Sequence, residues 1–430
     1  MSFNPSKCFS MRVTHKRKLV ITKYKMDLHT LEEVCNMAKL LTDQHSGERG
    51  VYDCIVVGGG AIGLGTALHL VRQGYRTLLL EQFSFPHTRG SSAGPSRMYR
   101  NAYIEEHHAK MVQEIWQMWE ELEQETKTTL HKRTGLLVIN NENVAAFHQL
   151  RDNLVRHRLP FQDLTTEQLV RRFPLMSYRG HYNILLDTEA GFLIANKCLR
   201  TMLDQFVKKG GTLHDGEKVV KIVPHRMVTV CTNKGHEYKA GSLVLTPGPW
   251  APKLLKPLGL DLPLKVWRVN VCFFKEKQPG SYLNYPAMFD ETKDGFIYCF
   301  PSRDYPGYMK FGYHLQWDEV DPDDRDRPGQ AGGNKLMVDI EAMKAYVQEH
   351  FPGLEPEPSI VENCMYTCTP EEEIHPVYHN IAIGCGFSGK GFKMALLMGK
   401  ILGDLAMGKP STYDLSPISM KRFLHQKAKL

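Results

Sequence analysis

Apolar residues between positions 50 and 83 form two short runs on either side of one amphipathic segment. The first run, residues 54–57, reads CIVV, and the second, residues 77–80, reads TLLL. Between them, residues 64–72 carry apolar positions at helical spacing, and Gly74 follows. This pattern predicts a strand, a helix and a second strand, the unit from which parallel sheets are built.

A glycine cluster joins the first predicted strand to the helix. It fits the pattern G-x-G-x-x-G and consists of Gly58, Gly59, Gly60, Ala61, Ile62 and Gly63. The first glycine of the pattern permits a tight turn, the second lets the backbone approach a pyrophosphate, and the third lets the helix pack on the strand. The pyrophosphate would lie at the helix N-terminus, where unpaired N–H groups and the helix dipole favour an anion.

An acidic residue ends the second predicted strand. Glu81 stands 23 residues after Gly58 and is followed by Gln82. An acid at this point can accept hydrogen bonds from a ribose, and it favours FAD or NAD over NADP, for which an arginine would be expected. Together, the strands, helix, glycines and acid predict a dinucleotide site rather than a tight turn alone.

The rest of the chain alternates between helical and strand patterns. Helices are expected over residues 104–127, 192–209, 338–350 and 392–407. Strands are expected over residues 135–139, 212–222, 227–232, 243–248, 264–276, 296–301, 309–314 and 380–384. The strands over 264–314 suit an antiparallel sheet. The late strand, with the glycine loop 386–391 and its helix, suits a second approach to the cofactor.

Composition narrows the function classes. The 430 residues can hold two domains, and no run of about 18 uncharged apolar residues predicts a membrane span. The net charge of +7 comes from residues 1–25, which hold seven basic residues and no acid; the remainder has 47 of each. A nucleic-acid-binding domain would itself be basic, so the composition argues against one.

Ten cysteines are present, and several lie inside apolar runs. These are Cys54, Cys231, Cys272, Cys299 and Cys385. They predict buried, reduced thiols rather than a disulfide framework. Cys364 and Cys368 lack the further ligand pairs that a zinc site requires, so no metal is expected.

The two ends of the chain suggest different destinations. Residues 1–49 lack periodicity and have no acid before Asp27, which is similar to a mitochondrial presequence. The last three residues, Ala428-Lys429-Leu430, are similar to the peroxisomal address of the S-K-L type, which an import receptor would bind. A peroxisome is the favoured location and a mitochondrion the alternative.

Six spaced motifs resemble the monomeric sarcosine oxidase family. In order they are VVGGGAIG with LLLEQF, GSSAGPSRMYRNAY, LVLTPGPW, MKFGYH, CMYT and GFSGKGFK. The resemblance runs from about residue 50 to the end. It implies a monomeric flavoprotein of the DAO and glutathione-reductase type, α/β (α+β overall). A Rossmann-like FAD-binding domain would be joined to a substrate domain built on an antiparallel sheet.

The resemblance also implies a reaction. A secondary amino acid such as sarcosine, L-pipecolate or L-proline would pass a hydride equivalent from its C–H bond to FAD and become an imine. Oxygen would then reoxidise the flavin and give hydrogen peroxide. The glycine fingerprint alone also permits an NAD-dependent dehydrogenase, although the late glycine motif and Cys364 favour flavin.

Particular residues carry over from the family's motifs. Cys364, an inert thiol on sequence grounds alone, would bind FAD covalently. Arg100 and Lys393 would hold the substrate carboxylate through a planar fork and a point charge, although either could be an ordinary surface cation. Lys310 would stabilise negative charge on oxygen, and His314 shares its face of an alternating strand. Also placed at the flavin or substrate are Arg97, Tyr298 and Tyr366.

The expected cofactor contacts are spread along the chain. They are Gly58, Gly60, Ala61, Ile62, Gly63, Glu81, Gln82, Ser91, Arg97, Val219, Gly248, Cys364, Gly386, Gly389, Gly391 and Lys393. An extension without regular structure is expected first, then a discontinuous FAD-binding domain, a substrate domain and a tail. Their expected bounds are, in that order, 1–49; 50–105, 187–262 and 362–415; 106–186 and 263–361; and 416–430.

Two departures from the family pattern bear on activity. Ala93 stands where the family often has a histidine, so a polar group facing the flavin would be lost. The segment from Thr369 to Asn380 is several residues shorter than the family's, just before His375. An impaired or non-catalytic flavoprotein is therefore an alternative interpretation.

Overall fold

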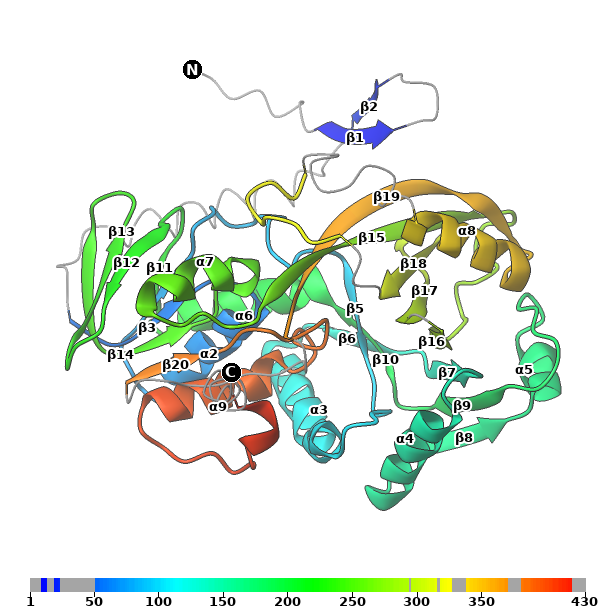
Figure 1. Ribbon diagram of the computed structural model, residues 1–430, viewed down its shortest axis with the longest axis horizontal. Coiled ribbons are helices and arrows are strands. Elements are labelled where there is room, and N and C mark those ends of the chain that lie inside the picture. Colours follow the sequence, from blue (N-terminus) through cyan, green and yellow to red (C-terminus); the bar gives the residue numbers. More distant parts are fainter. Residues whose placement is uncertain are drawn as a thin grey trace, which may run out of the picture. The chain divides into compact units, whose positions relative to one another are not determined.

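A computed structural model of the 430-residue chain describes residues 9–13, 19–23, 51–293, 295–314, 318–326, 338–369 and 380–419. The chain falls into two units, Met1–Gly50 and Val51–Leu430. In the first unit, strands β1 (Phe9–Val13) and β2 (Leu19–Lys23) form an antiparallel pair. The sequence had predicted no strand there. All further description concerns the second unit (Figure 1).

The glycine motif directly follows one strand of a seven-stranded sheet. The path of this sheet is β11, β4, β3, β14, β13 and β12, and β20 pairs with β14 outside that path. The bounds are Thr212–His214, Thr77–Leu80, Tyr52–Val57, Glu237–Leu245, Val228–Thr232, Val219–Val223 and, for β20, Ile381–Ile383. The pairs that join β11, β4, β3, β14 and β20 are parallel, and those that join β14, β13 and β12 are antiparallel.

Helix α2 (Ala61–Arg72) packs on α6 (Ala195–Lys208) and on α9 (Ala395–Ala406), which comes from the other end of the chain (Figure 1). The crossing with α9 depends on two glycines. A Cβ on Gly65 would lie 2.3 Å from the carbonyl oxygen of Ala395, and a Cβ on Gly399 would lie 2.3 Å from the carbonyl carbon of Gly65. The backbones of the two helices therefore touch, and α9 is fixed against the glycine motif.

An eight-stranded sheet forms the other half of the unit, in the order β19, β15, β18, β17, β16, β7, β9, β8. The bounds are Leu354–Cys368, Lys265–Glu276, Tyr308–His314, Gly295–Tyr305, Ala287–Thr292, Leu136–Asn140, Asn183–Asp187 and Phe161–Leu164. Only the β16–β7 pair is parallel. Helix α8 (Val338–His350) covers one face over β19, β15 and β18 (Figure 1).

The covered face of this sheet is an apolar core, which decides where its other side chains lie. On β18, Met309, Phe311 and Tyr313 belong to the core beneath α8. Because side chains alternate along a strand, Lys310 and His314 lie on the opposite face. The same alternation applies to β17 and β16. On these strands, the residues next to core residues have their side chains on this opposite face.

A three-stranded sheet and further helices complete the unit. The sheet has the order β5 (Ser96–Tyr99), β10 (Gly191–Ile194) and β6 (His131–Arg133). Among the described residues, the other α-helices are α3 (Glu106–Thr126), α4 (Val144–Arg156), α5 (Thr166–Arg172) and α7 (Ala251–Leu255). Across the described residues, no helix combines the length and the apolar character that crossing a membrane requires.

Most predicted elements are present, with some corrections. Residues 192–194, predicted as the start of a helix, belong to β10 instead, because they pair with both β5 and β6. The apolar stretch 212–222 contains two strands, β11 and β12, on opposite edges of the sheet path. Four of the five cysteines predicted to be buried thiols are buried and free, and Cys231 is free and half-buried. The predicted domain bounds stay a prediction.

The close contact between α2 and α9 predicts the opposite of what helix propensity predicts for an alanine at position 399. Alanine normally favours a helix over glycine by about 1 kcal/mol. Gly399→Ala should instead lower the free energy of unfolding by about 1–3 kcal/mol, because backbone atoms cannot move aside as a side-chain end can. Urea denaturation measures this. Gly241→Ala, whose Cβ would lie 3.4 Å from the nearest atom, is the control. A variant as stable as the parent would refute the close contact.

Candidate active site

The glycine turn between β3 and α2 has no room for side chains. Gly58 has a φ of +101°, a conformation that favours glycine. A Cβ on Gly63 would lie 1.8 Å from the carbonyl oxygen of Gly58. Gly60 is the N-cap of α2, and Ala61 and Ile62 begin the helix as buried residues. These are the features that a pyrophosphate requires at such a turn.

Glu81 lies buried directly after β4, beside the turn. Its carboxylate accepts hydrogen bonds from the backbone N–H of Gly59 at 2.7 Å and of Phe83 at 2.9 Å. Its backbone oxygen accepts from the N–H of Glu217 at 2.8 Å, which brings the start of β12 and Val219 close. A carboxylate has about four acceptor positions, so Glu81 can also accept from a ribose.

Two predicted cofactor residues lie at the margins of this turn. Gly248 opens a 3-10 turn (Gly248–Trp250) just after β14, with a φ of +53°. The end of β14 is tied to the glycine motif, because the Thr246 hydroxyl donates to the carbonyl oxygen of Gly58 at 3.0 Å. Gln82 is half-buried and directly follows Glu81.

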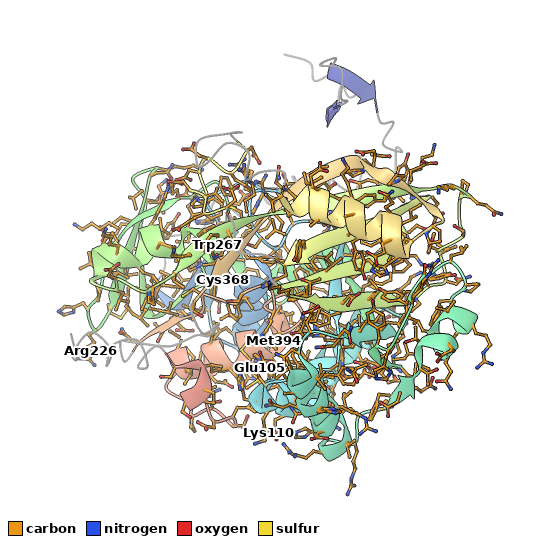
Figure 2. All side chains as sticks on the ribbon, turned by 45° about the vertical axis from the view of Figure 1, so that its right-hand side comes forward. Glu105, Lys110, Arg226, Trp267, Cys368 and Met394 are labelled. Carbon is orange, nitrogen blue, oxygen red and sulfur yellow. The ribbon has the colours of Figure 1, made fainter. Side chains whose placement is uncertain are left out.

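The late glycine loop is fastened to the end of β19. The backbone N–H of Ser388 donates to the carbonyl oxygen of Thr367 at 3.1 Å. Gly386 and Gly389 have positive φ values, and a Cβ on Gly391 would lie 2.8 Å from Phe387. Figure 2 labels Cys368, the last residue of β19, and Met394, which follows the loop. The loop is therefore held in one conformation against the face of the large sheet that lies opposite α8.

Cys364 lies half-buried on β19, opposite the loop that contains Ser91. Its sulfur is 3.9 Å from the carbonyl oxygen of Ser91. The Arg97 guanidinium donates to that same oxygen at 2.8 Å, to the carbonyl oxygen of Ser96 at 2.8 Å and to that of Ala93. Arg97 thus holds the Ser91–Ala93 part of the loop through backbone oxygens, beside the cysteine.

Aromatic side chains fill the face between β17, β18 and β19. The hydroxyls of Tyr298 and Tyr366 are 3.4 Å apart, and the His314 ring lies 5.1 Å from that of Tyr366. A Cβ on Gly312 would lie 2.3 Å from the Tyr298 ring, so only glycine fits beneath it. Burial raises the pKa of Tyr298 to about 12 and raises that of Tyr366 as well. Both hydroxyls are therefore neutral hydrogen-bonding groups at neutral pH.

A half-buried arginine, Arg100, lies between two aromatic rings at one side of this face. The Arg100 Cζ is 4.9 Å from the ring centre of Tyr103 and 4.8 Å from that of Phe289. The Nζ of buried Lys393 is 5.8 Å from the same Tyr103 ring. The Arg100 Nε is buried and has no hydrogen-bond partner in the structure. Two cations around one ring, one with an open donor, suit a carboxylate ligand.

Lys310 is a second buried cation of the site, besides Lys393. Its Nζ donates to the Ser96 hydroxyl at 3.1 Å and forms an ion pair of 3.4 Å with Asp304. Burial lowers the pKa of its ammonium group, and nearby Arg97 lowers it further, while Asp304 raises it. A chain of contacts through Ser96 and Arg97 thus links Lys310 to the loop beside Cys364.

The predicted residues fall into two linked groups. Arg97, Lys310, Tyr298, Tyr366 and Cys364 come together on one face of the large sheet, with the Gly389 loop against them. The dinucleotide residues gather at the turn after β3. Sequence reasoning missed Ser92, whose hydroxyl accepts from the Ala61 N–H at 2.9 Å, and also Ser96 and Asp304. The shortened segment before His375 lies outside the described residues.

The comparisons with known proteins agree with this geometry. The family model "FAD dependent oxidoreductase" (DAO) matches residues 53–405. The chain therefore belongs to the FAD-dependent oxidoreductase family. Within it, the chain is 43% identical to human peroxisomal sarcosine oxidase, over 87% of this chain and 97% of that protein. It is 32% identical to monomeric sarcosine oxidase of Bacillus sp. (strain NS-129), over 86% of this chain and 97% of the relative. These relatives confirm the sarcosine oxidase resemblance.

Solved structures confirm the fold class. The open form of NikD, an amino acid oxidase essential for nikkomycin biosynthesis, superposes with a TM-score of 0.73. It covers 86% of this chain and 97% of its own and is 24% identical, so this likeness concerns the fold. The FAD-dependent family also removes the NAD-dependent alternative.

The residues of the glycine turn fit the FAD that the family implies. No side chain covers the backbone at Gly58 and Gly63, where a pyrophosphate would lie, and neither position has space for a Cβ. The buried hydroxyl oxygen of Ser91 has no hydrogen-bond partner in the structure, and it lies on the loop beside Cys364. The turn and this loop are linked, because Ser92 accepts from Ala61.

Proposed function

We propose that this protein is an FAD-dependent oxidase of secondary amino acids, with sarcosine, L-pipecolate and L-proline as candidate substrates. The substrate loses two electrons and two protons and becomes an imine, and oxygen takes up both to give hydrogen peroxide. The observation that carries the proposal is the half-buried Arg100 guanidinium, which lies between two rings and has a buried Nε without a hydrogen-bond partner, while Lys393 lies at the same Tyr103 ring. The names of the sarcosine oxidase relatives support the substrate class.

In this proposal the side chains bind and orient the amino acid. Arg100 and Lys393 hold its carboxylate, because charge-assisted hydrogen bonds in a buried site are strong. The neutral hydroxyls of Tyr298 and Tyr366 contact the polar groups of the substrate without removing a proton. When bound, FAD supplies the two-electron acceptor. Ala93 does not remove support from the loop, since its backbone oxygen accepts from Arg97.

Peroxide release measures the activity directly. The full-length protein, reconstituted with FAD if needed, is given each candidate amino acid in the presence of oxygen. Peroxide with at least one secondary amino acid and none with its carboxamide would support the proposal. A yellow, folded protein that releases no peroxide with any of them would support the impaired alternative.

The remaining features of the proposal concern attachment and location. Cys364 binds the flavin covalently, supported by its position at the Ser91 loop. The protein acts as a monomer, as the names of the bacterial relatives indicate. It works in peroxisomes, supported by the name of the human relative and by the tripeptide that an import receptor would bind. Catalase activity there would remove the peroxide.

Arg100→Gln should weaken substrate binding. A hydrogen bond to a charged group contributes about 1.5–3 kcal/mol, so KM should rise about 10- to 150-fold. Steady-state kinetics measures this. Arg76→Gln is the control, because the Arg76 side chain is 68% exposed. An unchanged KM would contradict the carboxylate role.

Lys310→Met should slow reoxidation much more than flavin reduction. Loss of a buried stabilising charge costs about 10²- to 10³-fold in rate. Stopped-flow absorbance separates the two half-reactions. Lys275→Met makes the same change at an exposed position on neighbouring β15. Equal losses in both half-reactions would count against an oxygen-specific role.

Cys364→Ser should release flavin on acid denaturation, since a serine hydroxyl forms no thioether. The parent protein should keep its yellow colour in the precipitate. Cys231→Ser, at another half-buried cysteine, should behave like the parent. Colour retained in the Cys364 variant would exclude this attachment site.

A further inference from the structure

The amine of Lys310 has three acceptors around it. Its Nζ lies 3.1 Å from the hydroxyl oxygen of Ser96, 3.3 Å from the Ser96 carbonyl oxygen and 3.4 Å from the Asp304 carboxylate. An ammonium group has three N–H donors, so these three acceptors match it in number. The amine is therefore held in one orientation rather than only buried.

Asp304 and Ser96 are themselves fixed in the interior. The Asp304 side chain is 7% exposed, and the Ser96 hydroxyl donates to its Oδ2 at 2.7 Å. That same oxygen is the one nearest to the Lys310 Nζ. The serine hydroxyl thus accepts from the lysine and donates to the aspartate, which closes a three-membered polar cluster.

An irregularity in the sheet brings Asp304 to this position. Phe300 pairs with Lys310 and Tyr305 pairs with Tyr308, so residues 301–304 of β17 lie opposite Met309 alone. A bulge of this kind redirects side chains. The Ser302 hydroxyl anchors the bulge by donating at 2.6 Å to the buried carboxylate of Glu276.

The charges around Lys310 oppose one another. Arg97, from β5, is a like charge, while Asp304, from β17, and Glu362, from β19, are opposite charges. Glu362 is engaged elsewhere, since it accepts from the Tyr305 hydroxyl at 2.6 Å. Desolvation acts against the charged amine, and an amine that lost its proton could not stabilise negative charge on oxygen. Asp304 is the one carboxylate of these that contacts the amine directly.

We propose that Asp304, together with the Ser96 hydroxyl, is a positioning residue that keeps the Lys310 amine charged for the reduction of oxygen. The inference rests on the oxygen role of Lys310 proposed above. The β17 bulge, which places Asp304 beside Lys310, thus contributes to the site in addition to the glycine and cysteine motifs.

The first test is the pH profile of reoxidation in the holoenzyme. Lys310 is charged below its pKa, and loss of Asp304 lowers that pKa. In Asp304→Asn, the decline of the reoxidation rate with rising pH should therefore start about one pH unit or more lower. Rates at the acidic end should match those of the parent. Asp304→Glu should restore the parent profile, and flavin reduction should keep its own pH profile.

The second test measures the protonation of Lys310 directly, without catalytic turnover. Protein carrying ¹³C at lysine Cε is titrated by NMR in the oxidised state, and the Lys310→Met variant identifies the Lys310 signal. The midpoint should move to lower pH in Asp304→Asn, and in the same direction but less in Ser96→Ala. Ser96→Ala also tests the inference if Asp304→Asn does not fold.

The outcomes distinguish the proposed role of Asp304 from the proposed oxygen role of Lys310. An unchanged Lys310 midpoint in both variants, or a reoxidation rate lowered equally at all pH values, would overturn the inference. If Lys310→Met does not slow reoxidation, the oxygen role fails, while the NMR midpoints still decide whether Asp304 keeps the amine charged.

Discussion

The strict alternation of side chains along β18 is the constraint on which the site depends. Met309, Phe311 and Tyr313 are buried beneath α8, and this burial fixes the register of the strand. A slip of one residue would send the Lys310 ammonium into that apolar core, at the cost of burying an unpaired charge. The hydrophobic packing of one face therefore positions the chemistry of the other.

The half that carries the glycine motif depends on a different constraint, which is close contact between backbone atoms at glycines. Gly63 touches Gly58 within the turn, and Gly65 touches α9. Because α9 follows the late glycine loop, this helix contact also fixes the loop that lies against Tyr366 and His314. Residues more than 300 positions apart thus meet at one site, since Gly65 and Gly399 leave no gap between their helices.

The parts of the site that the sequence could predict are those with local signals. The glycine turn, Glu81 and the alternation of β18 follow from spacing within a few residues. Strand β19, which carries Cys364, was missed because Pro356 and Pro358 interrupt its first half, where its pairing with β15 is irregular. Asp304 was missed for a related reason. Its contact with Lys310 depends on a bulge and on Ser96, 208 residues away, neither of which has a local pattern.

The cations Lys310 and Arg100 differ in how their charge is balanced. Lys310 has a carboxylate of the protein beside it, which opposes the effect of burial on its charge. Arg100 lies against two aromatic rings and keeps an unsatisfied Nε. Ring faces stabilise a cation less than a carboxylate in direct contact does, so an anionic ligand would add to the weaker attraction that Arg100 already has for nearby Glu291. In the proposed function, a substrate carboxylate would therefore bind at Arg100, and Lys310 would keep its charge for the reaction with oxygen.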